Sequence, residues 1–130
     1  IKVSPHKFFK RDGANLRCRV PIPITTAALG GPLDVPTIEG KRSRITIKPG
    51  TQTGQQYRLK GKGMNVYKSE SRGDLYIEVY VETPVNLNKK QQNLLKQLDE
   101  SLGGSEAGKH SPESTGFFNK VKEFWTDLTD

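Results

Sequence analysis

Residues 73–82 read GDLYIEVYVE, and the strict alternation within this stretch decides the class of fold. One face of an extended chain would carry the aliphatic residues Leu75, Ile77, Val79 and Val81. The residues that alternate with them are the tyrosines Tyr76 and Tyr80 and the glutamates Glu78 and Glu82. Because successive side chains of a strand point to opposite faces, the pattern predicts a β-strand with one buried face. We expect this face to form a strip of the core.

Two hairpins are predicted before this strand. Asp12-Gly13-Ala14-Asn15 supplies turn residues between HKFFKR and LRCRVPIPI, and Glu39-Gly40 separates LDVPTI from KRSRITI. Pro36 has no N–H for a ladder, so its strand is expected at a sheet edge or bulge. Along the return strand, Arg44 and Thr46 are expected to point outward and Ile45 and Ile47 inward. Between the hairpins, TTAALGG has room for a single helical turn. We therefore expect a mainly β fold, a small β-sandwich of short, mostly antiparallel strands with a short connecting helix, followed by C-terminal helices.

The sequence period changes after Thr83-Pro84. Leucines recur at helical spacing, Asn88 and Gln91 have the spacing of a capping box, and two glycines end the pattern. This predicts a helix over 88–102. Residues 103–116 are rich in Gly, Ser and charge, a composition typical of a flexible linker. The predicted organisation is a β-domain at 1–87, the helix, the linker, and a last amphipathic helix at 117–130.

The closing segment holds three of the five phenylalanines and the only tryptophan of the chain. Its apolar residues follow one side of a three-turn helix and are Phe117, Phe118, Val121, Phe124, Trp125 and Leu128. A helix this short is marginal alone in water, so we expect the stripe to dock on another surface. The spacing leaves open whether that surface belongs to the same body or to a second copy.

Charge and composition restrict the function classes. The net charge is +7, and residues 1–88 hold fifteen Lys and Arg against seven Asp and Glu. Such a basic body attracts nucleic acid, an acidic partner or anionic lipid, or simply serves as a solvated surface. We find no signal peptide and no apolar run of membrane-spanning length. The single cysteine favours a reducing compartment, which we take to be the cytoplasm. The chain begins with IKV, which lacks a Met and alternates like a strand, so we expect a fragment of a longer protein.

Catalytic chemistry has little support in the sequence. His6 and His110 have no cysteine or carboxylate at metal-ligand spacing, and RLKGKGM does not match a phosphate-binding loop. Strand alternation makes Cys18 a small buried residue rather than a nucleophile. We predict no catalytic residue and no metal site. An enzyme would instead need a deep pocket with paired carboxylates, for instance around Asp34 and Glu39.

Several uncommon strings carry a resemblance to a known family. HKFFKRDGANLRCRVPIPITTAALGGPLDVPTIEG, PGTQTGQQYRLKGKGM, RGDLYIEVYVETPVNLNKKQQNLLKQL and HSPESTGFFNKVKEFW resemble, in this order, the C-terminal part of the bacterial DnaJ family of J-domain co-chaperones. The resemblance implies the second of two similar client-binding β-sandwich domains, followed by a dimerisation segment. The J domain, the Gly/Phe-rich linker and the cysteine-rich zinc repeats of the family are not among these residues. This chain is therefore expected neither to stimulate the ATPase of a DnaK-type partner nor to bind zinc or another cofactor.

The same resemblance implies partners and sites. The partners are unfolded client polypeptides, a second copy of the chain, and a DnaK-type chaperone engaged through the full-length protein, with no membrane. The implied client-binding residues are Phe9, Leu16, Cys18, Leu33, Val35 and Thr37, although plain core packing is an equal alternative for Leu16 and Val35. The implied dimer contacts are Phe117, Phe118, Val121, Phe124, Trp125 and Leu128, with Leu94, Leu98 and Leu102 beside them.

A physical mechanism accompanies these assignments. An extended client segment can add as a strand to an exposed sheet edge, where backbone hydrogen bonds tolerate many sequences. A dimer would hold one flexible chain at two places, so the second contact becomes intramolecular. The alternative is a basic β domain that binds nucleic acid. It is disfavoured because the aromatic residues gather in the closing helix instead of alternating with Lys and Arg on a sheet.

Overall fold

The computed structural model describes residues 8–65 and 71–129 of the chain. Its contacts divide the chain into two compact units, Ile1–Pro84 and Val85–Asp130, each of which is described by itself. Three features expected from the sequence lie outside the described residues. These are the opening IKV strand, His6, and the last residue of the predicted 117–130 helix.

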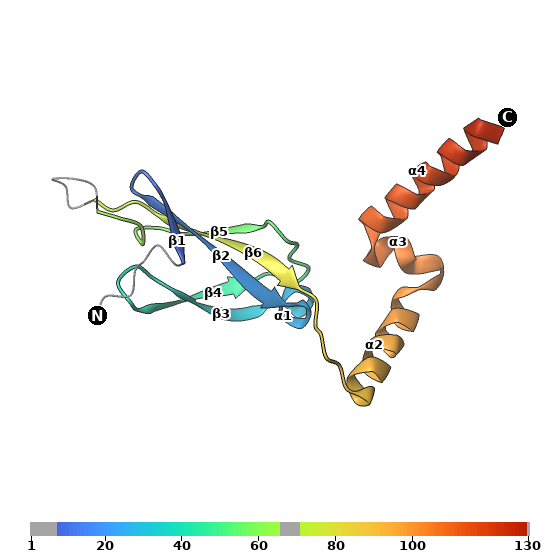
Figure 1. Ribbon diagram of the computed structural model, residues 1–130, viewed down its shortest axis with the longest axis horizontal. Coiled ribbons are helices and arrows are strands. Elements are labelled where there is room, and N and C mark those ends of the chain that lie inside the picture. The colour runs from blue at the N-terminus through green and yellow to red at the C-terminus, as the bar shows by residue number, and fades with distance from the viewer. Residues whose placement is uncertain (1–7, 66–70, 130) are drawn as a thin grey trace. The chain divides into compact units, whose positions relative to one another are not determined.

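The described part of the first unit contains six strands and one short helix (Figure 1). In chain order they are β1 (Phe9–Asp12), β2 (Asn15–Pro23), α1 (Ile24–Leu29), β3 (Gly31–Pro36), β4 (Arg42–Ile47), β5 (Gln56–Leu59) and β6 (Leu75–Glu82). One sheet has the strand order β1-β2-β6-β5, and the other consists of β3 and β4. All strand pairs are antiparallel except β2 with β6. The predicted mainly β sandwich with a short connecting helix is confirmed.

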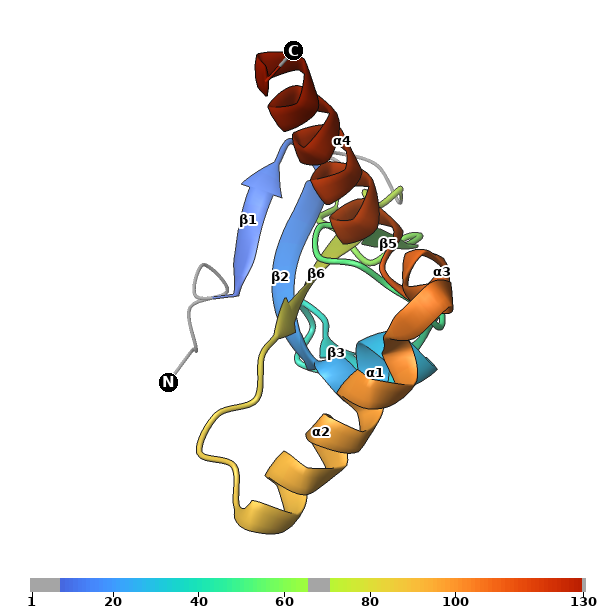
Figure 2. The same ribbon diagram turned by 90° about the vertical axis from the view of Figure 1, so that its right-hand side faces the viewer.

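The parallel pair of β2 and β6 is the longest in the first unit. Its register runs from Leu16 opposite Leu75 to Pro23 opposite Glu82, and Figure 2 shows β1, β2 and β6 side by side. Both strands alternate buried and more exposed residues. Leu75, Ile77 and Val79 are completely buried, as the alternation predicts. The most apolar strand thus occupies the interior of its sheet.

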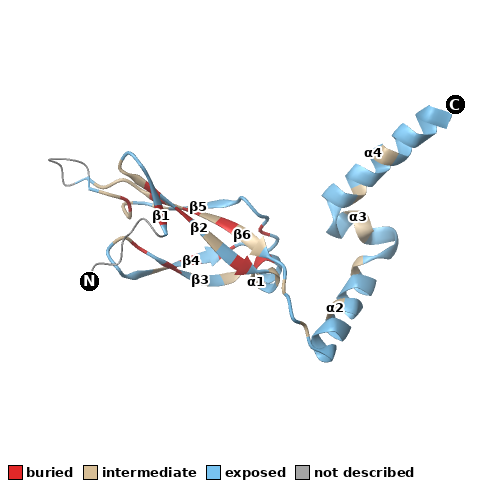
Figure 3. Ribbon diagram, viewed as in Figure 1, coloured by how far each residue is buried: buried red, intermediate tan, exposed pale blue. Residues whose placement is uncertain are grey.

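The core joins the two sheets. Buried side chains of β2 and β6 pack in one cluster with Val35 of β3 and with Ile45 and Ile47 of β4. Figure 3 shows buried residues on strands of both sheets. The inward orientation predicted for Ile45 and Ile47 is confirmed, since they are 7% and 1% exposed.

The first predicted hairpin also forms. Asp12 and Asn15 are cross-strand partners, so Gly13 and Ala14 make a two-residue turn between β1 and β2. Gly13 has a φ of +61°, a left-handed conformation that costs glycine little and other residues more. This explains why the turn lies at the glycine.

The second unit is helical. It contains α2 (Lys89–Leu102), the 3₁₀ turn η2 (Gly104–Glu106), α3 (Ala107–His110) and α4 (Pro112–Thr129). The predicted capping box is present, because Gln91 N–H donates to Asn88 Oδ1 at 2.8 Å and Asn88 N–H donates to Gln91 Oε1 at 2.9 Å. Two of the otherwise unpaired donors at the start of α2 are satisfied in this way.

Residues 103–116 differ from the flexible linker that their composition predicts. They contain η2, α3 and the first residues of α4, which begins at Pro112 rather than at Phe117. The Ser111 carbonyl accepts a hydrogen bond of 3.0 Å from Thr115 N–H. Proline is favoured at the first position of a helix because its missing N–H would have no partner there. The linker prediction was therefore wrong, and the Ser-Pro-Glu start signal in the sequence was missed.

Candidate functional site

Most of the residues predicted to contact clients lie inside the first unit. Five of the six are less than a tenth exposed, namely Phe9, Leu16, Cys18, Val35 and Thr37. Leu33 is partly exposed and packs against the same core. Phe9 and Cys18 face each other between β1 and β2. These side chains pack in the core, and their contact with a client remains a prediction.

The surroundings of Cys18 and Thr37 indicate a structural role for each of them. Burial raises the pKa of the Cys18 thiol, which favours the protonated, unreactive form. The Thr37 hydroxyl donates to the Lys41 carbonyl at 3.1 Å and accepts from Lys41 N–H at 3.3 Å. Thr37 therefore closes the turn between β3 and β4 with its own side chain.

Unpartnered sheet edges are the first surface that can bind a polypeptide. Among the described strands, β3 and β4 pair only with each other, so each has one edge without a neighbouring strand. β1 and β5 are the outer strands of the larger sheet. Such an edge presents backbone donors and acceptors to an incoming chain.

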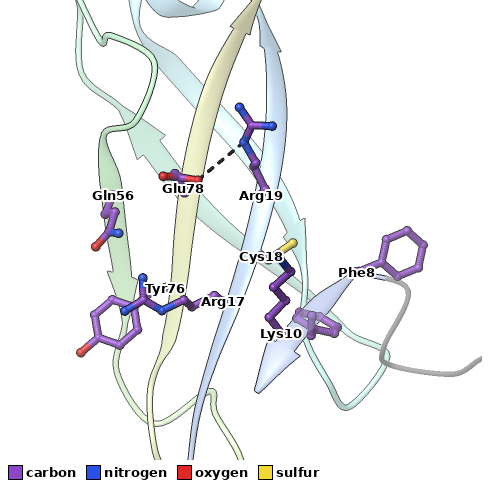
Figure 4. A pocket seen from close by; sticks show the side chains of 9 residues that line it. Phe8, Lys10, Arg17, Cys18, Arg19, Gln56, Tyr76 and Glu78 are labelled. Atoms are coloured by element: carbon purple, nitrogen blue, oxygen red, sulfur yellow. Dashed lines mark ion pairs between the residues drawn. The ribbon is translucent and has the colours of Figure 1, made fainter. Parts of the chain in front are cut away.

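A pocket of about 430 Å³ is the second such surface (Figure 4). Its lining residues come from β1 and the residue before it, β2, β5 and β6, and are Phe8, Phe9, Lys10, Arg17, Cys18, Arg19, Gln56, Tyr76 and Glu78. Arg19 Nε lies 3.6 Å from Glu78 Oε2, and the Arg19 guanidinium lies 4.2 Å from the centre of the Tyr80 ring. The pocket combines aromatic surface with three cations and one carboxylate. Such a lining suits a side chain with apolar and acidic character.

Sequence reasoning found only two of these lining residues, Phe9 and Cys18. Arg17 and Arg19 alternate with buried residues of β2, as Tyr76 and Glu78 do in β6. Their outward direction was readable from this alternation. Their proximity was not, because it depends on the parallel pairing of two strands far apart in the sequence.

From the sequence, nucleic-acid binding is disfavoured because the aromatic residues gather in the closing helix. The pocket is an exception to this distribution. Phe8 and Tyr76 line it with arginines, and Tyr80 contacts Arg19, so some aromatic side chains do lie beside cations. Arg17 and Arg19 are paired with Asp12 and Glu78, however. Carboxylates beside the cations oppose the approach of a phosphate backbone.

An arrangement of catalytic groups is not found among the described residues. These residues contain no group of three His, Cys, Asp or Glu side chains that could hold a metal ion. Asp34 is paired with Arg44, and Glu39 with Arg72. Hydrogen bonds from these arginines lower the pKa of both carboxyl groups, so neither is tuned as a general acid at neutral pH. Neither carboxylate lines the pocket.

The helices of the second unit expose apolar side chains. No described residue of α2 or α4 is buried. About half or more of the side-chain surface is exposed at Leu94, Leu98, Phe117, Phe118, Phe124, Trp125 and Leu128. Leu102 and Val121 are exposed to an intermediate degree. The rings of Phe117 and Phe118 meet edge to face with centres 5.0 Å apart. A membrane-crossing helix is not present in the described ranges, since none there is both long and apolar enough.

Comparisons with known proteins match both units. Residues 1–84 match the family described as DnaJ C terminal domain, and residues 90–127 match the Chaperone protein DnaJ C-terminal region. Over its whole length the chain is 63% identical to Chaperone protein DnaJ of Rhodospirillum centenum and 56% identical to that of Paramagnetospirillum magneticum. It is 51% identical to the Rhizobium meliloti protein of the same name. The chain spans about a third of the length of these relatives, 33%, 34% and 33% respectively.

The β-sandwich corresponds to the first matched region, and the helices of the second unit correspond to the second. The two matched regions together cover nearly every described residue. The chain therefore belongs to the DnaJ C-terminal domain family.

Proposed function

We propose that this chain is the client-holding and self-associating part of a DnaJ-type co-chaperone, which passes non-native polypeptides to a DnaK-type chaperone. The observation that carries the proposal is the sandwich with unpartnered strand edges, found in a chain that is 63% identical to a protein named Chaperone protein DnaJ. No enzymatic step is needed for this role, because holding a client requires only reversible contacts.

The client side of the proposal rests on the sheet edges and the pocket. A non-native segment is extended and has unpaired backbone groups, which an edge strand can satisfy whatever the side chains are. The pocket beside Phe8 and Tyr76 adds room for one client side chain. Weak and sequence-tolerant binding of this kind suits a protein that must release its clients.

The dimer side rests on the exposed stripe of α4. Burying an aromatic or aliphatic side chain contributes about 1.5–3 kcal/mol, so several of them can offset the cost of association. The α2 leucines Leu94, Leu98 and Leu102 extend the available apolar surface. Two copies would then offer two client sites to one unfolded chain.

The remaining parts of the proposal follow the relatives. Delivery to a DnaK-type partner belongs to the full-length protein, of which this chain resembles one third. We propose the cytoplasm as the compartment and no resident cofactor for this part. Zinc would be bound, on this proposal, by the cysteine-rich region of the complete protein.

Binding to a permanently unfolded probe tests the proposal. Fluorescently labelled α-lactalbumin that has been reduced and carboxymethylated is titrated with the chain, and anisotropy is recorded. The native disulfide-bonded protein is the matched control. We expect binding of the unfolded form only. Equal affinity for both forms, or no binding of either form, contradicts client holding. Tight and steeply salt-dependent binding of RNA or DNA in the same assay favours the nucleic-acid alternative.

A further inference from the structure

The two edges of the β3–β4 sheet differ in the hydrogen bonds that they can offer. Thr37 N–H donates to the Lys41 carbonyl at 2.9 Å, and these residues continue the register of the strand pair. In an antiparallel pair, residues that bond across the ladder alternate with residues whose N–H and C=O point away from it. The pairs Val35 with Ser43 and Leu33 with Ile45 therefore bond across. The outward-pointing pairs are Pro36 with Arg42, Asp34 with Arg44 and Pro32 with Thr46.

Prolines block the outer edge of β3. Of its outward residues, Pro32 and Pro36 have no N–H, which leaves Asp34 as the single backbone donor. This is a common protection of an edge strand against pairing with another chain. An incoming strand at this edge would leave some of its own carbonyls without a partner.

The outer edge of β4 is not blocked. Arg42, Arg44 and Thr46 each present an N–H and a C=O, and none of these groups bonds to another described residue outside the β3–β4 pair. The next outward donor is Lys48 N–H, which donates to the Tyr57 hydroxyl at 3.2 Å, so the free edge ends there.

The other edge strands offer less. β1 and β5 have four residues each, so strand alternation gives each of them two outward residues at most. Beyond its pairing with β1, β2 contains Pro21 and Pro23. Among the described strands, β4 therefore has the longest edge with unblocked donors.

We propose that a client segment adds as a third strand to the outer edge of β4 rather than to that of β3. This inference rests on the proposed function and names the surface that performs it. The preferred segment alternates apolar and acidic residues. Its inward side chains would extend the core beside Ile45 and Ile47, which are both buried.

The charge on the solvent-exposed face of β4 supports the acidic positions of the proposed client segment. Arg42 and Arg44 lie on the solvent-exposed face of β4, opposite the face that carries Ile45 and Ile47. Arg44 is paired with Asp34 on its β3 side at 3.0 Å, whereas Arg42 forms no ion pair with any described residue. Lys41 and Lys48 flank the strand. A glutamate placed beside Arg42 would meet positive charge that Asp34 only partly compensates.

Two proline substitutions provide a matched test of the edge. Thr46→Pro removes one outward backbone donor from β4. Asp34→Pro removes the single outward backbone donor of β3 together with the ion pair to Arg44. Neither substitution removes a backbone hydrogen bond of the ladder. The probe is a labelled seven-residue peptide that alternates leucine and glutamate. We expect Thr46→Pro to weaken its binding to the 130-residue chain about two- to tenfold, the effect of one hydrogen bond. Asp34→Pro should not weaken it.

A charge variant and chemical-shift mapping decide the question even if a proline variant fails to fold. Arg42→Glu changes only an exposed side chain, and we expect it to weaken binding of the leucine–glutamate peptide and to strengthen binding of a leucine–lysine peptide. In the unmodified chain, the backbone amides of Arg42, Arg44 and Thr46 should shift most on titration.

The outcomes separate this inference from the proposed function. Shifts confined to β3, or weakening by Asp34→Pro alone, would overturn the β4 assignment while client binding stands. Equal affinity for both peptides would overturn the charge preference. If neither the peptides nor the unfolded α-lactalbumin bind, the proposed function itself fails.

Discussion

The backbone N–H of Asp74 donates a hydrogen bond of 2.8 Å to the side-chain oxygen Oδ1 of Asn15, although 59 residues separate the two in sequence. Next to it, Leu16 N–H donates to the Asp74 carbonyl at 2.9 Å. Both bonds lie where the parallel pair of β2 and β6 begins, at Leu16 opposite Leu75. This contact therefore aligns β6 with the β1–β2 hairpin and sets which outward side chains meet at the pocket.

Replacing Asn15 by alanine should destabilise the first unit. The substitution leaves the partly buried Asp74 N–H without its acceptor, which costs about 1–3 kcal/mol. Urea unfolding followed by circular dichroism measures the free energy of unfolding. Gln55→Ala is the control, because its exposed side chain makes no hydrogen bond with a described residue. Similar losses in both variants would contradict the assigned role of Asn15.

The Asp74 carboxylate should make stability depend on acid pH. Gly61 N–H donates to it at 2.9 Å and Arg58 Nε at 2.6 Å, and these bonds, led by that of Gly61, lower the pKa of Asp74. A carboxyl group whose pKa is lower in the folded state stabilises that state above the unfolded pKa of about 3.9 and loses the effect as pH falls through the folded pKa. We expect unfolding in urea to become easier below about pH 4.

Asp74→Asn tests this dependence. The variant should be less stable at neutral pH and should lack that part of the loss on acidification. Glu82→Gln serves as the control, since Glu82 is exposed and forms no ion pair with a described residue. An acid profile that is the same for Asp74→Asn and the unmodified chain would refute the role of this carboxylate.

Gly73 should not tolerate alanine. A Cβ at this position would fall on the carbonyl group of Ala14, whereas a Cβ at Gly40 would meet nothing within 4 Å. Gly40 has a φ of +82°, so its replacement costs about 1 kcal/mol of backbone strain. For Gly73→Ala we expect a loss of about 3 kcal/mol, the upper range for overpacking. Thermal unfolding compares the two variants, and equal shifts in Tm would contradict the close approach at Ala14.

Asn88 should stabilise α2 through its capping box. Asn88→Ala removes the acceptor of Gln91 N–H and is expected to cost about 1 kcal/mol. Amide hydrogen exchange in the first turn of α2 reports this loss directly. Asn93→Ala, in the middle of the same helix, should have the opposite sign because alanine is the better helix former. Faster exchange in both variants, or in neither, would argue against the cap.

The apolar stripe of α4 should cause self-association. Light scattering over a dilution series compares the full chain with one that ends at Ser111, just before α4. We expect the full chain to be a dimer and the shortened chain to be a monomer. Trp125→Ala should weaken the dimer. Glu123→Gln, on the opposite side of the helix, is the control and should keep the dimer. Monomers throughout would withdraw the dimer contacts and leave the stripe to dock on another surface.

Local periodicity determined much of this protein from sequence alone. The alternation in residues 75–82 and in β4 identified buried faces that the structure confirms, because the side-chain period of a strand is independent of its neighbours. Pro36 indicated an edge strand, and β3 is one. The composition of residues 103–116 is typical of a linker, whereas the local sequence Ser-Pro-Glu starts a helix at Pro112.

Tertiary structure alone decided which strands became neighbours. The period of β2 and that of β6 are satisfied by either direction of pairing and by many partners, so the sequence pattern contained no sign of their parallel contact. That contact brings Arg17 and Arg19 beside Tyr76 and Glu78 and buries Leu16 and Cys18, which were expected to meet clients. Local spacing specifies which face of a strand is buried, whereas the neighbour that covers this face depends on packing of the whole sandwich.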